Sequence, residues 1–432
     1  MDGEGARAAN AGLVLSVLVA SGATTRQQIG EATGLSKATV SRAVRRMVQA
    51  GLVVEGALVR GPDGGRASQT LQFRGGDELV CGVDMGGTNT RLVVVDQRAR
   101  PLAAWRVLTA HLDTDADTAD WIAEELSAGC PDVVRRGLIS TVVGVPGVVV
   151  PGSNEVQQVP NLPAIGGTGF ARQLSARLSG RVAFRNDANL ALVGEMCAGA
   201  AAGLQDVAMV MIGTGVGAGV ALRGELLEGT RGLVGEFGSL PLDTVGTVVE
   251  DALSGAGLAQ ARAALGVAVG PLPLGPHAGD SHDESAVRLR VVGAVHALCV
   301  AMAVGYDLEM IVFGGHGSAD LVEAFELVRK RLETGLPAAP KLGLSELGDA
   351  GGVLGAVAMA LQAAQQQIGA GIGLSYAGAL GGELRATAPE VVAALERPAP
   401  GTSGAVRTTE QIDPRRPVGA PRTLQTRWDG RA

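Results

Sequence analysis

The sequence predicts an α/β protein in which an N-terminal winged helix-turn-helix precedes a larger body of two lobes. Three observations lead to this fold class. Residues 25–47 have the pattern of two short helices joined at a glycine. Two glycine-rich turns, about 130 positions apart, each connect one apolar strand to the next. Lys and Arg are in excess only near the N-terminus. We assign residues 1–75 to the winged helix-turn-helix, 76–368 to the two-lobed body, and 369–432 to a Gly-, Ala-, Pro- and Arg-rich tail that we expect to be solvated and mobile.

Composition favours a folded protein of two or three domains, because the chain has 432 residues, of which 46% are hydrophobic and 18% charged. Residues 1–75 contain nine Lys or Arg and five Asp or Glu, a net charge of +4, which leaves −11 for the remainder. Any contact with nucleic acid is therefore expected at the N-terminus, and the body should repel DNA.

The cysteines and the apolar stretches indicate the cellular compartment of the protein. Four scattered cysteines without C-x-x-C spacing indicate a reduced, cytoplasmic protein. The apolar residues 12–20 resemble the core of a signal peptide. However, Asp2 and Glu4 place negative charge where such a peptide needs positive charge, and we assign the stretch to the first helix of the N-terminal domain. We expect no membrane span, since no other apolar run is long enough.

The helix-turn-helix lies between Thr25 and Ala50. Gly34 stands at the break, and Ser36 is placed to cap the second helix. Val40, Val44 and Met47 recur at helical spacing and should face the core, which leaves an outward face with four basic side chains and no acidic one. Such a helix fits the major groove of DNA, although a solvated face of an ordinary three-helix bundle is the alternative. The expected DNA contacts are Ser36, Lys37, Thr39, Ser41, Arg42, Arg45 and Arg46, the last two on the phosphate backbone.

A wing follows this helix. Residues 52–55 and 69–73 are predicted as two short strands around the turn-rich residues 61–66. Arg66, at the tip, is expected to enter the minor groove of DNA, and the alternative is an ordinary hairpin charge. The pair Gly75-Gly76 marks the predicted domain boundary.

Both glycine-rich turns are followed by a strand. This excludes Walker and dinucleotide loops, which need a helix N-terminus directly behind the turn. Backbone amides of such a hairpin can still approach phosphate oxygens. An apolar strand at residues 310–313 also ends in glycines. We therefore expect phosphate contacts from Asp84, Gly86, Gly87, Thr88 and Asn89 in the first turn, from Gly213, Thr214, Gly215 and Gly217 in the second, and from Gly314 and Gly315.

Paired loops of this kind are typical of actin-like kinases, whose two lobes enclose a nucleotide cleft. Between them, Asp187 follows the apolar residues 182–184 and precedes a predicted helix. A carboxylate there can accept the proton of a sugar hydroxyl as its oxygen attacks a terminal phosphate, so Asp187 is the catalytic base if the chain is a kinase. The alternative is that Asn186 or Asp187 caps the helix. We expect His316 to be a neutral loop residue, and no histidine pairs with cysteines at metal-ligand spacing.

Together these motifs resemble the ROK family, named for repressors, open reading frames and kinases, over about residues 10–368. The resemblance rests on residues 84–91, 144–149, 160–163, 186–189 and 213–217. With the winged helix in front, the chain is similar to the family's sugar-responsive repressors, such as the xylose and N-acetylglucosamine types. The resemblance implies an actin-like ATPase fold of the sugar-kinase type, with sugar contacts from Asn161, Asn186, Asp187, Glu236 and Glu250.

The chain departs from the family after Glu236. Where the family usually has a histidine that binds both zinc and sugar, this chain has Ser239, and residues 240–255 contain no cysteine of the family's cluster. The tryptophan that often follows the asparagine segment is also replaced, by Ala164-Ile165. We therefore predict no structural zinc and no other metal site, because zinc has no ligands here with which to support Glu236.

Three functions follow. The first is a cytoplasmic repressor of sugar metabolism or transport genes, which binds operator DNA as a homodimer or higher homo-oligomer and releases it when a sugar binds. The second is an active ATP-dependent, hexose-type kinase that also binds DNA. The third is a sugar-blind DNA-binding dimer. Ser239 and the missing cysteines weigh against catalysis, so enzyme activity is not our first expectation. Regulation needs no cofactor, whereas a kinase would need ATP and Mg²⁺.

Overall fold

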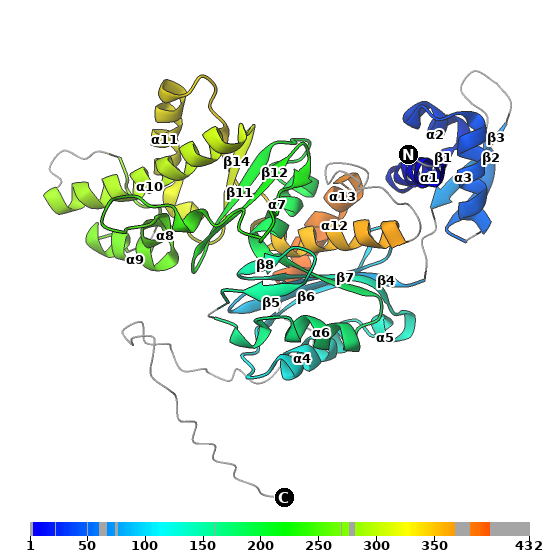
Figure 1. Ribbon diagram of the computed structural model, residues 1–432, viewed down its shortest axis with the longest axis horizontal. Coiled ribbons are helices and arrows are strands. Elements are labelled where there is room, and N and C mark those ends of the chain that lie inside the picture. Colours follow the sequence, from blue (N-terminus) through cyan, green and yellow to red (C-terminus); the bar gives the residue numbers. More distant parts are fainter. Residues whose placement is uncertain are drawn as a thin grey trace, which may run out of the picture. The chain divides into compact units, whose positions relative to one another are not determined.

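The computed structural model divides into two units, Met1–Ala399 and Pro400–Ala432, and everything below concerns the first. Its described residues are 3–21, 23–49, 51–59, 67–73, 77–159, 161–268, 270–275, 281–367 and 381–397. Figure 1 shows the arrangement of its helices and strands. The predicted Arg66 contact and the predicted boundary at residues 75–76 lie outside these ranges.

The N-terminal domain is a winged helix, as predicted. Gly34 ends one helix in the left-handed conformation, with φ 69°, and Thr25 forms a capping box with Gln28. The three strands pair in the order β1-β3-β2. Both wing strands begin within one residue of the prediction. The second ends where predicted, at Phe73, whereas the first extends to Val59. The elements are α1 (Gly3–Ala20), β1 (Thr24–Thr25), α2 (Arg26–Thr33), α3 (Lys37–Gln49), β2 (Val53–Val59) and β3 (Ser68–Phe73).

The first lobe contains a five-stranded sheet in the order β10-β7-β4-β5-β6. Alternate residues of its central strand face opposite sides: Cys81 packs with the core beneath α4 and α6, whereas Val80 packs with α12. Both faces are therefore covered, which accounts for the continuous apolar runs. The elements are β4 (Leu79–Met85), β5 (Asn89–Val95), β6 (Pro101–Leu108), α4 (Asp115–Gly129), α5 (Asp132–Arg136), β7 (Leu138–Val145), β8 (Val148–Val150), β9 (Glu155–Gln157), η1 (Pro163–Ile165), α6 (Gly169–Arg177) and β10 (Arg181–Asn186).

The second lobe repeats this design with the strand order β13-β12-β11-β14-β15. One face packs on α7, and the other packs on α8 to α11. The elements are α7 (Asp187–Ala198), β11 (Val207–Ile212), β12 (Val216–Leu222), β13 (Glu225–Leu226), η2 (Phe237–Ser239), α8 (Val249–Leu253), α9 (Gly255–Ala264), α10 (His282–Tyr306), β14 (Met310–Gly314), η3 (Ser318–Leu321), α11 (Val322–Gly335), β15 (Lys341–Leu344), η4 (Gly348–Ala350) and α12 (Gly351–Gln365).

Helix α10 departs from one expectation. Within the described residues it is long and apolar enough to cross a membrane by length and composition, although the sequence pattern predicted no such run beyond residue 20. Nearly half of its apolar stretch is buried, and it packs against α8, α9 and α11. These contacts are those of a core helix, which explains why a long stretch here is apolar.

Helices α7 and α12 cross at a point where their backbones touch. A Cβ on Gly355 would lie 1.9 Å from the carbonyl oxygen of Leu190, and a Cβ on Gly194 would lie 2.2 Å from that of Gly351. No residue larger than glycine fits at either position without a shift of backbone. Because α7 packs on the second sheet and α12 on the first, this crossing joins the two lobes.

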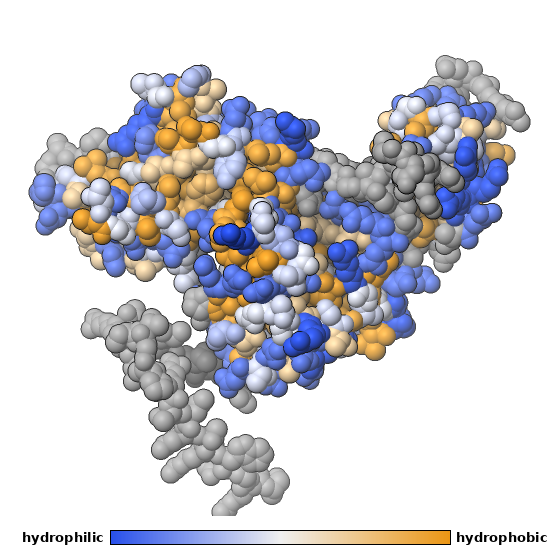
Figure 2. All heavy atoms as spheres, viewed as in Figure 1, coloured by the Kyte–Doolittle hydropathy of each residue, from blue (hydrophilic) through white to orange (hydrophobic). Residues whose placement is uncertain are grey.

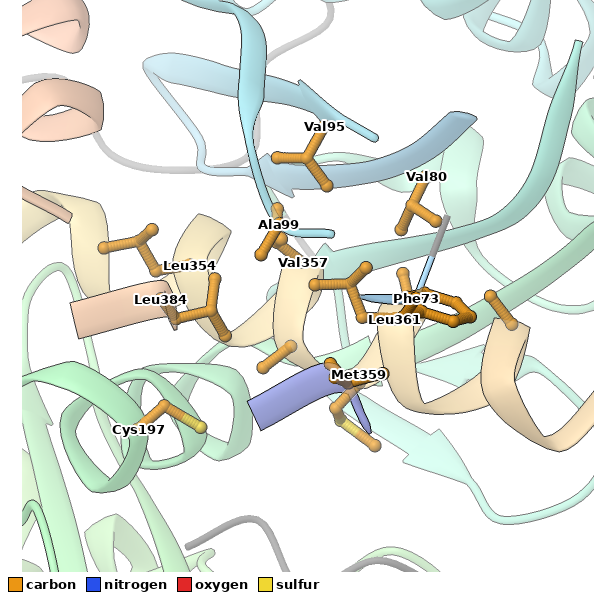
Figure 3. Close-up of a cluster of buried hydrophobic side chains, with 14 of the residues drawn as sticks. Phe73, Val80, Val95, Ala99, Cys197, Leu354, Val357, Met359, Leu361 and Leu384 are labelled. Atoms are coloured by element: carbon orange, nitrogen blue, oxygen red, sulfur yellow. The ribbon is translucent and has the colours of Figure 1, made fainter. Parts of the chain in front are cut away.

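The tail prediction is wrong for residues 381–395. They form α13 (Gly381–Leu395), which packs on α7 and β6 and buries Leu384, Ala388, Val391 and Leu395. Figure 3 shows Leu384 within the cluster that includes Leu354, Val357 and Ala99. The four buried residues recur every three or four positions, so one face of the helix is apolar despite the Gly- and Ala-rich composition. Residues 398–432 lie outside the described ranges.

Candidate functional site

The outward face of α3 is the candidate nucleic-acid interface. Val40 and Val44 are fully buried, which turns Lys37, Arg42, Arg45 and Arg46 to solvent as predicted. Thr39 and Ser41 are half-buried. The Ser36 hydroxyl accepts a hydrogen bond from the Thr39 amide at 3.3 Å and so caps the helix. Figure 2 shows hydrophilic side chains gathered over α3. The geometry is that of a helix whose basic face is open to a polyanion.

Arg26 is a residue of this domain that sequence reasoning missed. Its guanidinium forms an ion pair at 2.5 Å with Glu55, and these two side chains line a depression together with Ser41 and Arg45. Arg26 begins α2, whereas Glu55 lies in the wing strand β2, so the ion pair connects the helix-turn-helix to its wing. No local sequence signal indicates it, because the two residues are 29 positions apart.

The first glycine-rich turn joins β4 to β5 and is held from β6. The Gly86 amide donates to the Asn89 carbonyl at 2.9 Å, which closes the hairpin. Thr109 Oγ1 donates to the Gly86 carbonyl at 2.7 Å, and His111 Nε2 lies 2.9 Å from the Gly87 carbonyl. These bonds fix the backbone of the turn and engage the Gly86 amide within it, and phosphate binding by the turn stays a prediction.

Asp84 precedes this turn and is buried beside Arg91, with 3.5 Å between the guanidinium and the carboxylate. Burial raises the pKa of Asp84 to about 6; Arg91 opposes the rise and Asp349 adds to it. Arg91 also forms an ion pair with Asp349, just before α12. The structure brings the predicted Asn161 to the same turn, since a Cβ on Gly87 would lie 3.9 Å from its Cβ.

The second turn joins β11 to β12 and meets the end of β14. The Gly213 amide donates to the Gly215 carbonyl, and the Gly255 amide donates to the Gly213 carbonyl. Gly315 has φ +80°, and a Cβ there would lie 2.3 Å from the Ile212 carbonyl oxygen, so the backbone must approach β11 closely. The predicted glycines of both segments are thus neighbours. Phosphate binding by them remains a prediction.

Glu250 lies beside this second turn. Its carboxylate accepts a hydrogen bond from the Val216 amide at 3.1 Å, and a Cβ on Gly215 would lie 3.1 Å from the same oxygen. The carboxylate therefore contacts a loop whose amides the sequence assigns to phosphate. The contact of Glu250 with sugar stays a prediction.

Asp187 begins α7, but Asn186 is the cap. Asn186 Oδ1 accepts from the Asn189 amide at 3.1 Å, and its Nδ2 donates to the Gly147 carbonyl at 3.0 Å. Asp187 accepts from the Ala188 amide at 2.8 Å and is half-buried. Burial and then the negative charge of Asp84 raise the pKa of Asp187 to about 7, against the backbone hydrogen bonds that lower it. Glu236 also raises it.

Glu236 is positioned by the glycine before it. Gly235 has φ +107°, and a Cβ there would lie 1.9 Å from the Ala218 carbonyl oxygen. Burial, followed by the charge of Glu250, raises the pKa of Glu236. The charges of Asp84 and Glu236 both act on Asp187, and these three residues are called the carboxyl cluster below; β4 of the first lobe and two segments of the second contribute to it. Paired carboxylates of this kind can accept hydrogen bonds from the hydroxyls of a polyol.

The zinc site expected of family relatives does not fit these residues. Ser239 is exposed, and residues 235–255 offer no cysteine or histidine side chain. Across the described ranges, no group of three or more His, Cys, Asp and Glu side chains is placed to hold a metal ion. The absence of a structural zinc stays a prediction, and in this structure the backbone at Gly235 positions Glu236.

A winged helix followed by two lobes of this topology, each with a glycine-rich turn between two strands, defines a class of DNA-binding proteins with a sugar-kinase-type body. The body matches the ROK family over residues 80–363, and the N-terminal domain matches the MarR family over residues 9–67. The chain belongs to the ROK family, with a MarR-type winged helix in front.

Similar proteins include kinases and regulators. The N-acetyl-D-glucosamine kinase of Pectobacterium carotovorum subsp. carotovorum (strain PC1) is 28% identical over 66% of this chain and 99% of its own length. The "Putative xylose repressor" of Caldicellulosiruptor sp. (strain Rt8B.4) is 26% identical over 54% of this chain and 58% of its own length.

Two solved structures show the same fold. The ROK hexokinase from Thermus thermophilus covers 67% of this chain and 99% of its own, with 28% identity and a TM-score of 0.56. A ROK family transcriptional regulator, described as a homolog of the E. coli MLC protein, covers 90% of this chain and 100% of its own, with 18% identity and a TM-score of 0.67. The match to the regulator therefore covers a larger share of this chain than the match to the hexokinase.

Proposed function

We propose that this chain is a transcriptional repressor of sugar metabolism or transport genes, which binds operator DNA as a homodimer or higher homo-oligomer and responds to a sugar. One observation carries the proposal: the exposed basic face of α3 shares a polypeptide with the carboxyl cluster of Asp84, Asp187 and Glu236. The regulator fold in the comparisons and the xylose-repressor relative support it.

The carboxyl cluster can couple sugar binding to DNA binding. Asp84 belongs to the first lobe, whereas Asp187 and Glu236 belong to the second, so a sugar that hydrogen-bonds to both sides favours one arrangement of the lobes. The glycine crossing of α7 and α12 couples these lobes through direct backbone contact. A sugar changes operator affinity only if it binds the DNA-bound and free forms with different affinity.

The test is DNA binding with and without sugar. The full chain is titrated onto the DNA that flanks its own gene, over a series of salt concentrations and with a panel of pentoses, hexoses and N-acetylhexosamines. We expect at least one sugar to change Kd by about 5- to 150-fold, the usual range of coupling between sites. Identical Kd values with every sugar would leave a sugar-blind DNA-binding protein.

Arg42→Ala tests the DNA interface. Arg42 is exposed on α3, and loss of a base contact costs about 1–3 kcal/mol, or roughly 5- to 150-fold in affinity. Loss of a phosphate contact instead lowers the slope of log K against log salt by about 1. Arg135→Ala, which removes an exposed arginine of α5, should leave the titration unchanged. Wild-type binding by Arg42→Ala contradicts the placement of the recognition helix.

A sugar kinase is the second candidate, and the pKa of Asp187, about 7, favours it because a general base works best with a pKa near the working pH. In that case the two glycine turns would hold ATP with Mg²⁺, which supplies charge neutralisation at the transferred phosphate. Formation of ADP that depends on a sugar, in the wild type and not in Asp187→Ala, would establish the kinase. No sugar-dependent ADP would leave regulation alone.

A further inference from the structure

A cavity adjoins the carboxyl cluster on the side of Glu236. Its volume is about 710 Å³, within the range of small-molecule sites. The segment from Gly229 to Pro241 forms most of it, and Tyr306, the last residue of α10, completes the wall. This segment includes the stretch in which the chain departs from its family, at Ser239.

The walls of the cavity are mainly apolar. Phe237 and Tyr306 pack edge to face, with 6.2 Å between ring centroids and 75° between ring planes. Leu233, with 52% of its surface exposed, and Leu240 add to the apolar lining. A large exposed aliphatic side chain beside an aromatic pair is a surface that apolar ligands cover favourably.

Glu236 lines the cavity and also belongs to the carboxyl cluster. Gly235 holds the Glu236 backbone in place, because its φ of +107° and its contact with Ala218 admit no side chain. A ligand whose hydroxyls contact Glu236 can therefore extend toward Leu233 and the aromatic pair, which line the same cavity.

The wall segment is anchored on the first lobe. Glu228 forms an ion pair with Arg185 of β10 at 3.1 Å. Gly232, with φ +76°, packs so closely on β8 that a Cβ would lie 2.3 Å from the Val149 carbonyl oxygen. A ligand in the cavity would thus contact a segment of the second lobe that the first lobe holds in place.

We propose that the effector is a glycoside with an apolar aglycone, whose sugar lies at the carboxyl cluster and whose aglycone lies in this cavity. The inference rests on the proposed sugar response and names the class of effector. The apolar lining accounts for the preference for a glycoside over the free sugar. An aglycone buried against Leu233, Phe237 and Tyr306 adds binding free energy, and a free sugar has no such group to bury.

The test is calorimetric titration of the full chain with each free sugar of the panel and with its α- and β-phenyl glycosides. We expect at least one phenyl glycoside to bind about ten-fold or more tightly than its free sugar, as burial of a ring of this size predicts. Leu233→Asp should bring the ratio of the two affinities close to one. Leu289→Asp, the same change at an exposed leucine of α10 that does not line the cavity, should keep the wild-type ratio.

The outcomes separate the two proposals. Binding of free sugars without any gain from the phenyl group, or a gain that persists in Leu233→Asp, overturns the aglycone cavity and leaves the sugar response intact. Absence of binding by every sugar and every glycoside overturns both. Thr230→Trp, at an exposed lining residue, is a second variant that should reduce the gain by filling the cavity.

Discussion

At the scale of single residues, the carboxyl groups of the site are buried or half-buried and their charges act on one another. Asp84 and Asp187 lie in opposite lobes. Burial raises the pKa of Asp84 to about 6, and burial together with the charge of Asp84 raises the pKa of Asp187 to about 7. Glu236 shares the same environment. A carboxyl group with a pKa of about 7, such as that of Asp187, is partly protonated at neutral pH and can both donate and accept hydrogen bonds.

This cluster predicts a pH-dependent stability. A folded-state pKa raised above the ordinary value means that, between about pH 4 and pH 7, the folded chain binds more protons than the unfolded chain at Asp187. Its carboxyl therefore destabilises the fold increasingly as pH rises through this window. Asp187→Asn should raise Tm relative to wild type at pH 8, and the difference should disappear at pH 4, as measured by thermal denaturation.

Asp120→Asn supplies the opposite control. Arg177 lowers the pKa of Asp120, so that carboxylate contributes stability above its unfolded pKa and loses it as pH falls through the folded pKa. Its substitution should lower Tm at pH 8 or leave it unchanged. A Tm for Asp187→Asn that lies below wild type at pH 8 would show that its hydrogen bond to Ala188 outweighs the charge.

At the scale of elements, the crossing of α7 and α12 depends on glycines that no local pattern explains. Gly355 lies inside a helix, where glycine costs about 1 kcal/mol relative to alanine. This cost is offset because the backbones of α7 and α12 meet at Gly355. A Cβ at this position would lie 1.9 Å from the Leu190 carbonyl oxygen. The same reasoning explains Gly194 on the facing helix.

Gly355→Ala should therefore destabilise the chain although it improves helix propensity. Forcing a methyl group into this contact costs about 1–3 kcal/mol, measured as a lower midpoint in urea unfolding. Gly293→Ala is the matched control, because Gly293 is also helical and nothing lies within 4 Å of its added Cβ. That variant should be as stable as wild type or gain up to about 1 kcal/mol. Equal midpoints for both variants would mean that the crossing is loosely packed.

At the scale of the whole molecule, α13 extends the core beyond the ROK match, which ends at residue 363. It buries Leu384, Val391 and Leu395 in the same cluster as the helix α12 and the sheet of the first lobe. The first compact unit accordingly ends at Ala399 and not near residue 368. The folded body therefore needs residues that composition alone places in a tail.

Two truncations test this boundary. A chain that stops after residue 380 should lose several kcal/mol of stability, because each buried leucine that is lost costs about 2–5 kcal/mol. A chain that stops after residue 399 should keep the wild-type urea midpoint, because it retains the whole first unit. Leu384→Ala gives the same test without truncation. A wild-type midpoint for the shorter chain would show that α13 adds nothing to the core.

What the sequence by itself determined are the features that neighbouring residues specify. The cap at Ser36, the break at Gly34 and the helical spacing of Val40 and Val44 define the recognition helix, because capping and amphipathicity act within one or two turns. The glycine turns and their flanking strands follow in the same way from apolar runs and a change of backbone direction. Ser239, where the resembled family usually has a histidine, led to the prediction of no structural zinc.

What only the tertiary structure decided depends on residues far apart in the chain. The pKa of Asp187 depends on Asp84 in the other lobe, the carboxylate of Glu250 reaches the second glycine turn, and α13 returns to pack beside α7. The cavity beside Glu236 likewise exists only once Tyr306 meets Phe237. Desolvation, charge interaction and packing are set by distance in space and not by separation in sequence, so no local pattern can report them.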